Sequence, residues 1–114
     1  MSKTSELQGA ALDWAVAKCE GAETWNDCCQ ILLVGDDEPY HPSTNWEQGG
    51  PIIEREGISL EYACADYKWL WVAYKLGRPD EDNPQNDNSP LIAVMRCYVA
   101  SKLGDEVEIP EGLK

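Results

Sequence analysis

The sequence predicts an α+β fold in which a small, mainly antiparallel sheet packs against two main helices. Apolar residues recur at helical spacing near both ends of the chain, over residues 5–19 and 90–103. Shorter stretches alternate or run apolar as strands do, near residues 29–34, 58–62, 68–74 and 106–109. With 114 residues the chain has the length of a single domain, so we expect one core and one site.

The first helix is expected to begin at Ser5, because Gln8 three positions later completes a capping box. Gly21 ends the periodic run. Within this helix Trp14 is expected to anchor the core, while Asp13 and Lys18 point outward. The apolar stripe consists of Leu7, Ala10, Ala11, Trp14 and Ala17.

A buried strand is expected next, over residues 29–34, ending at the turn-rich residues 35–39. The two alternating segments at 58–62 and 68–74 predict antiparallel strands joined around residues 63–67. Residues 75–89 are rich in Gly, Pro, Asn and Asp, which predicts a mobile loop or lid.

The last helix has the clearest boundary signals of the chain. Ser89 is placed to cap it, Pro90 suits its first position, and Gly104 ends it. Residues 105–110 then alternate and stop at a proline, which is typical of an edge strand guarded by charge.

The charge is strongly negative: Lys and Arg total 9 against 21 Asp and Glu, and the net charge is −12. A phosphate backbone would be repelled over most of this surface, so duplex nucleic acid is not an expected partner. The acidic runs are either solvated loops or a face that docks on a basic host protein. No apolar run reaches membrane-spanning length, and the first residues do not form an export signal. The number of Cys residues, five, is odd. These observations predict a soluble cytosolic protein with reduced thiols.

Residues 40–56 form the candidate site, because they combine two prolines, a glycine pair, short polar side chains and two aromatics. Ser43 or Thr44 is expected to cap one helical turn that Gly49 ends, and Pro51 then starts either a second short helix or an extended segment. Free amides at the glycines and nearby hydroxyls would bind an anion beside an aromatic wall. The predicted ligand-binding residues are Tyr40, Ser43, Thr44, Asn45, Trp46, Gly49, Gly50 and Arg96.

Arg96 lies between core positions of the last helix, so its guanidinium either reaches a bound phosphate or carboxylate or pairs with one of the acids. Enzymatic chemistry has few candidates, because His41 is the single histidine and would have to act with Ser43 or a cysteine. The adjacent Cys28 and Cys29 lack zinc-ligand spacing. We therefore expect no catalytic residues, no metal and no cofactor.

Three parts of the sequence resemble a known family: residues 12–17, residues 40–56, and residues 90–104 with their Pro-Leu-Ile-Ala-Val-Met-Arg start. Together they are similar to the NinX-like proteins of tailed bacteriophages and prophages. The resemblance implies a phage-encoded accessory protein expressed inside a bacterium, in a family without an assigned function. It implies no role for Cys28, Cys29 or the acidic loop before Ser89.

Three functional hypotheses follow. The first is a non-enzymatic binder that sequesters a small anionic, nucleotide-like host molecule, such as a defence signal. The alternative is an acidic inhibitor or DNA mimic that covers a basic groove of a host protein. The third is a small hydrolase built on His41. The surplus of Trp and Tyr is also consistent with self-association.

Overall fold

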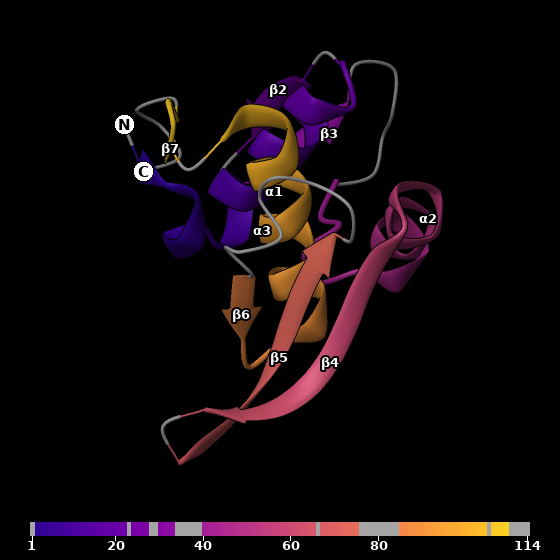
Figure 1. Cartoon of the computed structure of the whole chain (residues 1–114). Coiled ribbons are helices and arrows are strands. Elements are labelled where there is room, and N and C mark those ends of the chain that lie inside the picture. Colours follow the sequence, from indigo (N-terminus) through magenta and orange to yellow (C-terminus); the bar gives the residue numbers. More distant parts are fainter. Residues whose placement is uncertain are drawn as a thin grey trace.

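The computed structural model describes residues 2–22, 24–27, 30–33, 40–65, 67–75, 85–104 and 106–109. It confirms the predicted α+β class (Figure 1). In chain order the elements are β1 (Ser2–Lys3), the 3-10 turn η1 (Thr4–Glu6), α1 (Gly9–Cys19), β2 (Thr24–Asp27), β3 (Gln30–Leu33), α2 (Trp46–Glu56), β4 (Ile58–Ala65), β5 (Lys68–Lys75), β6 (Gln85–Asp87), α3 (Pro90–Leu103) and β7 (Glu106–Val107).

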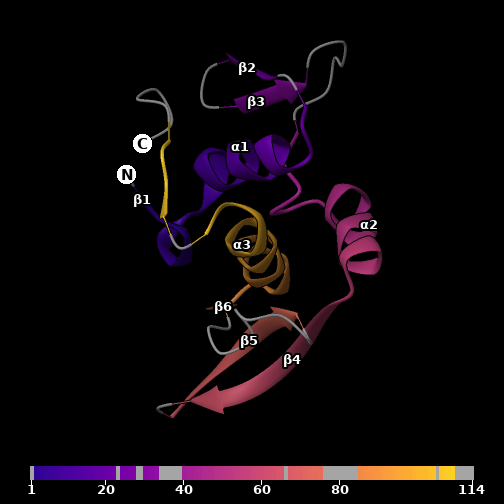
Figure 2. The ribbon, with the colours of Figure 1, turned by 45° about the horizontal axis from the view of Figure 1, so that its top comes forward.

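Helix α3 lies at the centre of the molecule, between α1 on one side and the β4–β5–β6 sheet on the other (Figure 2). Its boundaries confirm the prediction: Ser89 Oγ accepts a hydrogen bond from the Ile92 N–H at 3.5 Å, and Gly104 ends the helix at a φ of 88°. The helix is buried almost all round, because layers pack on both of its sides. Its buried residues are Leu91, Ala93, Val94, Met95, Arg96, Cys97, Tyr98 and Val99.

The prediction of one sheet is wrong, since the described strands form three separate antiparallel sheets. β3 pairs with β2, and β7 pairs with β1. Helices α1 and α3 lie between the β2–β3 hairpin and the β4–β5–β6 sheet, so β3 cannot reach β4 (Figure 2).

The predicted hairpin of residues 58–74 is confirmed and is longer than expected. β4 and β5 pair from Ile58 opposite Lys75 to Ala65 opposite Lys68. β6 falls inside the segment predicted as a loop and pairs with the inner part of β5, from Trp71 to Ala73. Residues 76–84 of that predicted loop lie outside the described residues.

Two predictions for the first helix are wrong. The helix begins at Gly9 and not at Ser5, because Leu7 and Gln8 are extended and separate η1 from α1. Asp13 was expected to point outward but is only 5% exposed. Trp14 packs partly buried against the core, and the Nζ of the exposed Lys18 lies 5.2 Å from the centre of its ring.

Candidate functional site

The segment before α2 is a compact turn that is closed by its own polar groups. The carbonyl of His41 accepts hydrogen bonds from the N–H groups of Thr44 and Asn45, both at 3.0 Å. The N–H of His41 donates to Gln48 Oε1 at 2.7 Å, and its Nδ1 lies 3.0 Å from Thr44 Oγ1. This hydroxyl is exposed, so Thr44 is one predicted site residue that the structure leaves on the surface.

A buried carboxylate from α1 holds this turn in place. Asp13 Oδ1 accepts a hydrogen bond from the Ser43 N–H at 3.0 Å, and Ser43 is itself only 1% exposed. Burial raises the pKa of Asp13 above its usual value, while the hydrogen bond from the Ser43 N–H acts to lower it. The position of Ser43 therefore serves the attachment of the turn to α1.

Helix α2 is one continuous helix, so the prediction of a single turn ended by Gly49 is wrong. Asn45, and not Ser43 or Thr44, caps it by accepting a hydrogen bond from the Glu47 N–H at 2.9 Å. The Gly49 N–H donates to the Asn45 carbonyl at 2.9 Å. Gly49 and Gly50 both lie within the helix, and it does not end until Gly57, with a φ of 64°. The expected cluster of amides free for an anion is absent at Gly49.

Gly49 is required by packing. A Cβ atom there would lie 2.6 Å from the Pro42 carbonyl oxygen and 2.8 Å from Leu91 Cδ2. Apart from the two chain neighbours and the backbone of α2 itself, no described atom lies within 4 Å of a Cβ atom built at Gly50. Gly49 lets α2 approach α3 closely. Gly50 leaves the outer side of α2 without a side chain at this position.

The two aromatics of the candidate site differ in exposure. Trp46 is 54% exposed at the first position of α2. Tyr40 is half-buried against the core, and burial raises its pKa to about 12 with further contributions from the carboxylates of Glu20 and Asp13. The guanidinium of Arg55, which is bonded to Glu20, acts in the opposite sense on this pKa.

Arg96 is engaged by groups of its own chain. Its Nε donates to the Leu7 carbonyl at 2.7 Å, and its Nη1 pairs with Asp87 Oδ1 at 3.1 Å. The side chain is 8% exposed. Of the two roles that the sequence left open, the structure has the ion pair with an acid, and this pair joins α3 to β6.

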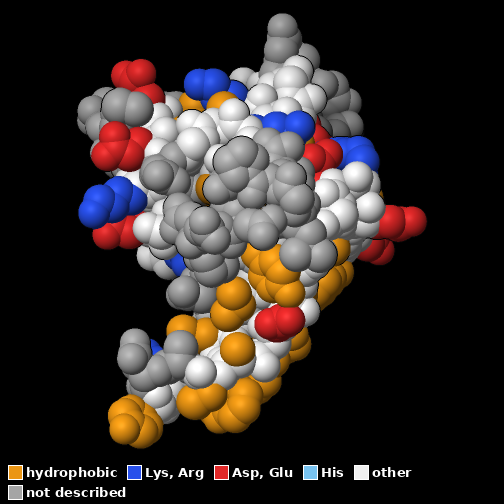
Figure 3. Space-filling view, in the orientation of Figure 1, with side chains coloured by type: hydrophobic (Ala, Val, Ile, Leu, Met, Phe, Trp, Pro, Cys, Tyr) orange, Lys and Arg blue, Asp and Glu red, His pale blue; other side chains and the backbone are white. Residues whose placement is uncertain are grey.

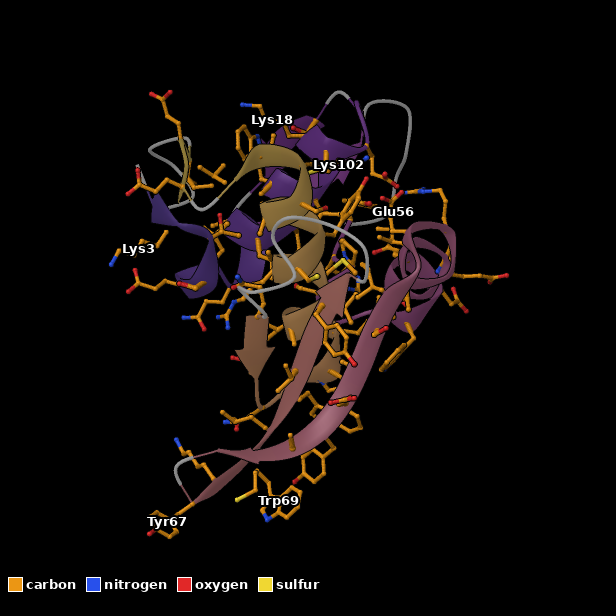
Figure 4. All side chains as sticks on the ribbon, viewed as in Figure 1. Lys3, Lys18, Glu56, Tyr67, Trp69 and Lys102 are labelled. Atoms are coloured by element: carbon orange, nitrogen blue, oxygen red, sulfur yellow. The ribbon has the colours of Figure 1, made fainter. Side chains whose placement is uncertain are left out.

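A polar network that sequence patterns do not indicate joins all three helices. The guanidinium of Arg55 forms two hydrogen bonds with the carboxylate of Glu20, at 3.1 and 2.6 Å, and a third with the Tyr98 hydroxyl at 3.2 Å. Lys102 Nζ lies 3.7 Å from Glu56 Oε1 (Figure 4). Burial and the hydrogen bond to Glu20 raise the pKa of Tyr98, and the bonds to Glu20 raise that of Arg55. The network fixes how α2 sits against α1 and α3.

A second surface stands out on the hairpin of β4 and β5. Hydrophobic side chains gather on this part of the molecule, below the body as it is viewed in Figure 3. The ring of Tyr62 on β4 contacts two indoles on β5, with its centre 5.3 Å from that of Trp69 and 4.9 Å from that of Trp71. Tyr62 and Trp69 are 56% and 57% exposed. We name these three residues the hairpin aromatic cluster.

The described residues contain no group of three or more His, Cys, Asp and Glu side chains arranged to hold a metal ion. None of the helices in the described part of the chain is both long and apolar enough to cross a membrane.

The fold and these surfaces define a small α+β protein whose most prominent exposed features are aromatic and acidic side chains. The family model of Bacteriophage P22, NinX matches residues 3–102. The match covers most of the chain, so this protein belongs to that family, as the sequence resemblance indicated. A search of curated proteins finds no match.

Proposed function

We propose that this chain is a non-enzymatic phage accessory protein that binds a basic surface of a host protein through the outer face of α2. This face consists of Trp46, Glu47, Pro51 and Glu54. All four residues are exposed, and Glu47, Pro51 and Glu54 follow one another at helical spacing. α2 lies at the side of the molecule, where a partner can reach it (Figure 1).

The observation that carries the proposal is the half-exposed indole of Trp46 next to exposed carboxylates. Tryptophan is among the residues that most often dominate the binding energy of protein interfaces. Gly50 lies one helical turn after Trp46 and has no side chain to cover this part of the helix. Glu47 and Glu54, together with the net charge of −12, would attract a basic partner and orient it.

The test is site-specific photocrosslinking in phage-infected bacteria. A photoreactive amino acid at Pro51 on the outer face should form a defined adduct with one host protein, and the same amino acid at the exposed Ser5 should not. Trp46→Ala should weaken the purified complex by about 30-fold, since truncation of a central aromatic typically costs about 2 kcal/mol. Glu47→Gln with Glu54→Gln should weaken it at low salt and have less effect at high salt. The proposal fails if Pro51 and Ser5 give the same adducts, or if neither gives any.

Capture of a small anionic, nucleotide-like molecule by Tyr40, Thr44 and Trp46 is the second candidate. It is favoured by the exposure of Trp46 beside the His41–Thr44 turn. Calorimetry with linear and cyclic nucleotides tests it, with Trp46→Ala as the variant that should lose binding. Arg96 is unsuitable for this test because it is buried and ion-paired, so its substitution would disturb the fold. The absence of micromolar binding would remove this candidate and leave the first one standing.

A further inference from the structure

The apolar side of the β4–β5 hairpin extends beyond the helix that covers it. Near the body this side is formed by Ile58 and Ala73, which are buried in the core. Alternation along the strands places Tyr62, Trp69 and Trp71 on the same side, nearer the tip. The exposed fractions of Tyr62 and Trp69 show that this part of the side is uncovered.

β4 is also an edge strand. The sheet order is β4-β5-β6, and among the described residues no strand pairs with the other edge of β4. β4 pairs with β5 in regular register over its whole length, contains neither Pro nor Gly, and carries one charged residue, Glu61. Edge strands are normally protected by prolines, bulges or several charges, so this edge is open to a further strand.

Tyr67 lies at the tip of the hairpin and is fully exposed (Figure 4). Its φ is 66°, a left-handed conformation that costs a non-glycine residue about 1–2 kcal/mol. The two-residue connection between Ala65 and Lys68 accounts for this backbone conformation, because tight hairpin turns require positive φ. The exposed ring adds an apolar group to the open end of the hairpin.

We propose that the β4 strands of two copies of this chain pair antiparallel, edge to edge, about a twofold axis. The pairing joins the two three-stranded sheets into one continuous sheet. Each copy offers the other a strand of equal length, and the twofold axis places both hairpin aromatic clusters on the same face of that sheet.

The charge distribution favours a second copy as the occupant. The hairpin of residues 58–75 contains two acids and two lysines, so its net charge is zero, while the whole chain carries −12. Antiparallel pairing places the two acidic bodies at opposite ends of the joined hairpins. The molecule is 40 Å long, whereas charges are screened beyond about 8 Å at physiological salt. At about 10 mM salt the screening length grows to about 30 Å and the two bodies repel each other. Raising the salt from that level should therefore strengthen the dimer, the opposite of its effect on an acidic protein bound to a basic partner.

Charge also selects the register. The even-numbered residues of β4 lie on the aromatic side of the sheet, so each must face an even-numbered residue of the second copy for the two aromatic sides to match. The two registers with the longest overlap then place the twofold axis at Glu61 or at Tyr62. An axis at Glu61 would place two carboxylates opposite each other, which is unfavourable. With the axis at Tyr62, Glu61 faces Ala63 of the second copy, and the tip residue Tyr67 reaches the level of the second copy's Gly57.

The test is sedimentation equilibrium of the full chain over a range of protein concentrations at low and high NaCl. We expect a shift from the 12.7 kDa monomer to twice that mass, with tighter association at high salt. Ala63→Glu sets two carboxylate pairs opposite each other and should weaken the dimer about 2- to 30-fold, whereas Ala63→Gln, of similar size, should not. Combining Ala63→Glu with Glu61→Lys should restore association, because each new Glu then faces a Lys.

Circular dichroism of each variant shows that the monomer is folded. A chain that stays monomeric at high salt overturns the proposal, as does a monomer whose β4 takes up a foreign peptide strand. A dimer whose affinity is unchanged by Ala63→Glu and by its combination with Glu61→Lys overturns the edge-to-edge pairing.

Discussion

Replacing each glycine of the Gly49-Gly50 pair by alanine separates a packing role from a conformational one. Both glycines lie inside α2, so each replacement gains up to about 1 kcal/mol of helix propensity. At Gly50 no atom outside its chain neighbours and the helix's own backbone lies near a new Cβ, but Pro51 opposes the gain, because a Cβ before a proline disfavours helical backbone. At Gly49 the new methyl group would lie 2.6 Å from the Pro42 carbonyl oxygen and 2.8 Å from Leu91 Cδ2, where ordinary contacts need about 3.5–4.0 Å. Since one of these atoms belongs to the backbone, the helix must move.

Such overpacking typically costs about 1–3 kcal/mol. The difference in unfolding free energy between the two variants therefore compares the packing cost at Gly49 with the cost of a Cβ before Pro51 at Gly50. At roughly 4 °C per kcal/mol for a chain of this size, overpacking should lower the melting temperature of Gly49→Ala by about 4–12 °C, and Gly50→Ala should melt above it. Thermal and urea denaturation followed by circular dichroism measures both quantities. Equal melting temperatures, or a more stable Gly49→Ala variant, would refute the close approach of α2 to α3 at Gly49.

Three further predictions follow. Burial raises the pKa of Asp13 in the folded protein. The contribution of Asp13 to stability is therefore largest below its unfolded-state pKa and is lost as the pH rises through its folded-state pKa. Urea melts between about pH 3 and pH 7 should show this decline for the wild type and not for Asp13→Asn. Burial raises the pKa of Cys19 to about 12, so alkylation at neutral pH followed by peptide mass mapping should modify the exposed Cys64 well before Cys19. Tyr67→Gly should raise the free energy of unfolding by about 1 kcal/mol, since glycine accepts the left-handed backbone, and an unchanged denaturation midpoint would contradict the strain.

The elements that the sequence predicted well are those whose signals are local. Ser89, Pro90 and Gly104 mark the ends of α3 within the chain segment itself, and the alternation in β4 and β5 needs no distant partner to be recognised. α2 was misjudged because Gly-Gly-Pro is locally a helix breaker. Gly49 is explained by its close packing against α3 and the preceding turn, and residue preferences along the chain do not reveal such a contact.

The candidate site was predictable to the same limited degree. The exposure of Trp46 follows from its place at the start of a helix at the side of the molecule. The partners of Asp13 and Arg96 were not foreseeable, because Ser43 lies 30 residues from Asp13, and Asp87 belongs to a segment whose composition predicted a loop. The bonds of Glu20 to Arg55 and Tyr98 span 35 and 78 residues, and an acid-rich sequence offers many equivalent candidates for such pairs.

The hairpin aromatic cluster has a role within the single chain, but that role does not account for the whole hairpin. Tyr62 lies directly opposite Trp71 and diagonal to Trp69, and such cross-strand aromatic pairs stabilise a two-stranded ribbon by about 0.2–1 kcal/mol each. These pairs explain how the hairpin stays folded beyond the three residues of β5 that β6 supports. They do not explain why the strands continue past the covering helix. Pairing of β4 with a second copy gives this extension a use, because it covers the open edge and brings each tip to the base of the other hairpin.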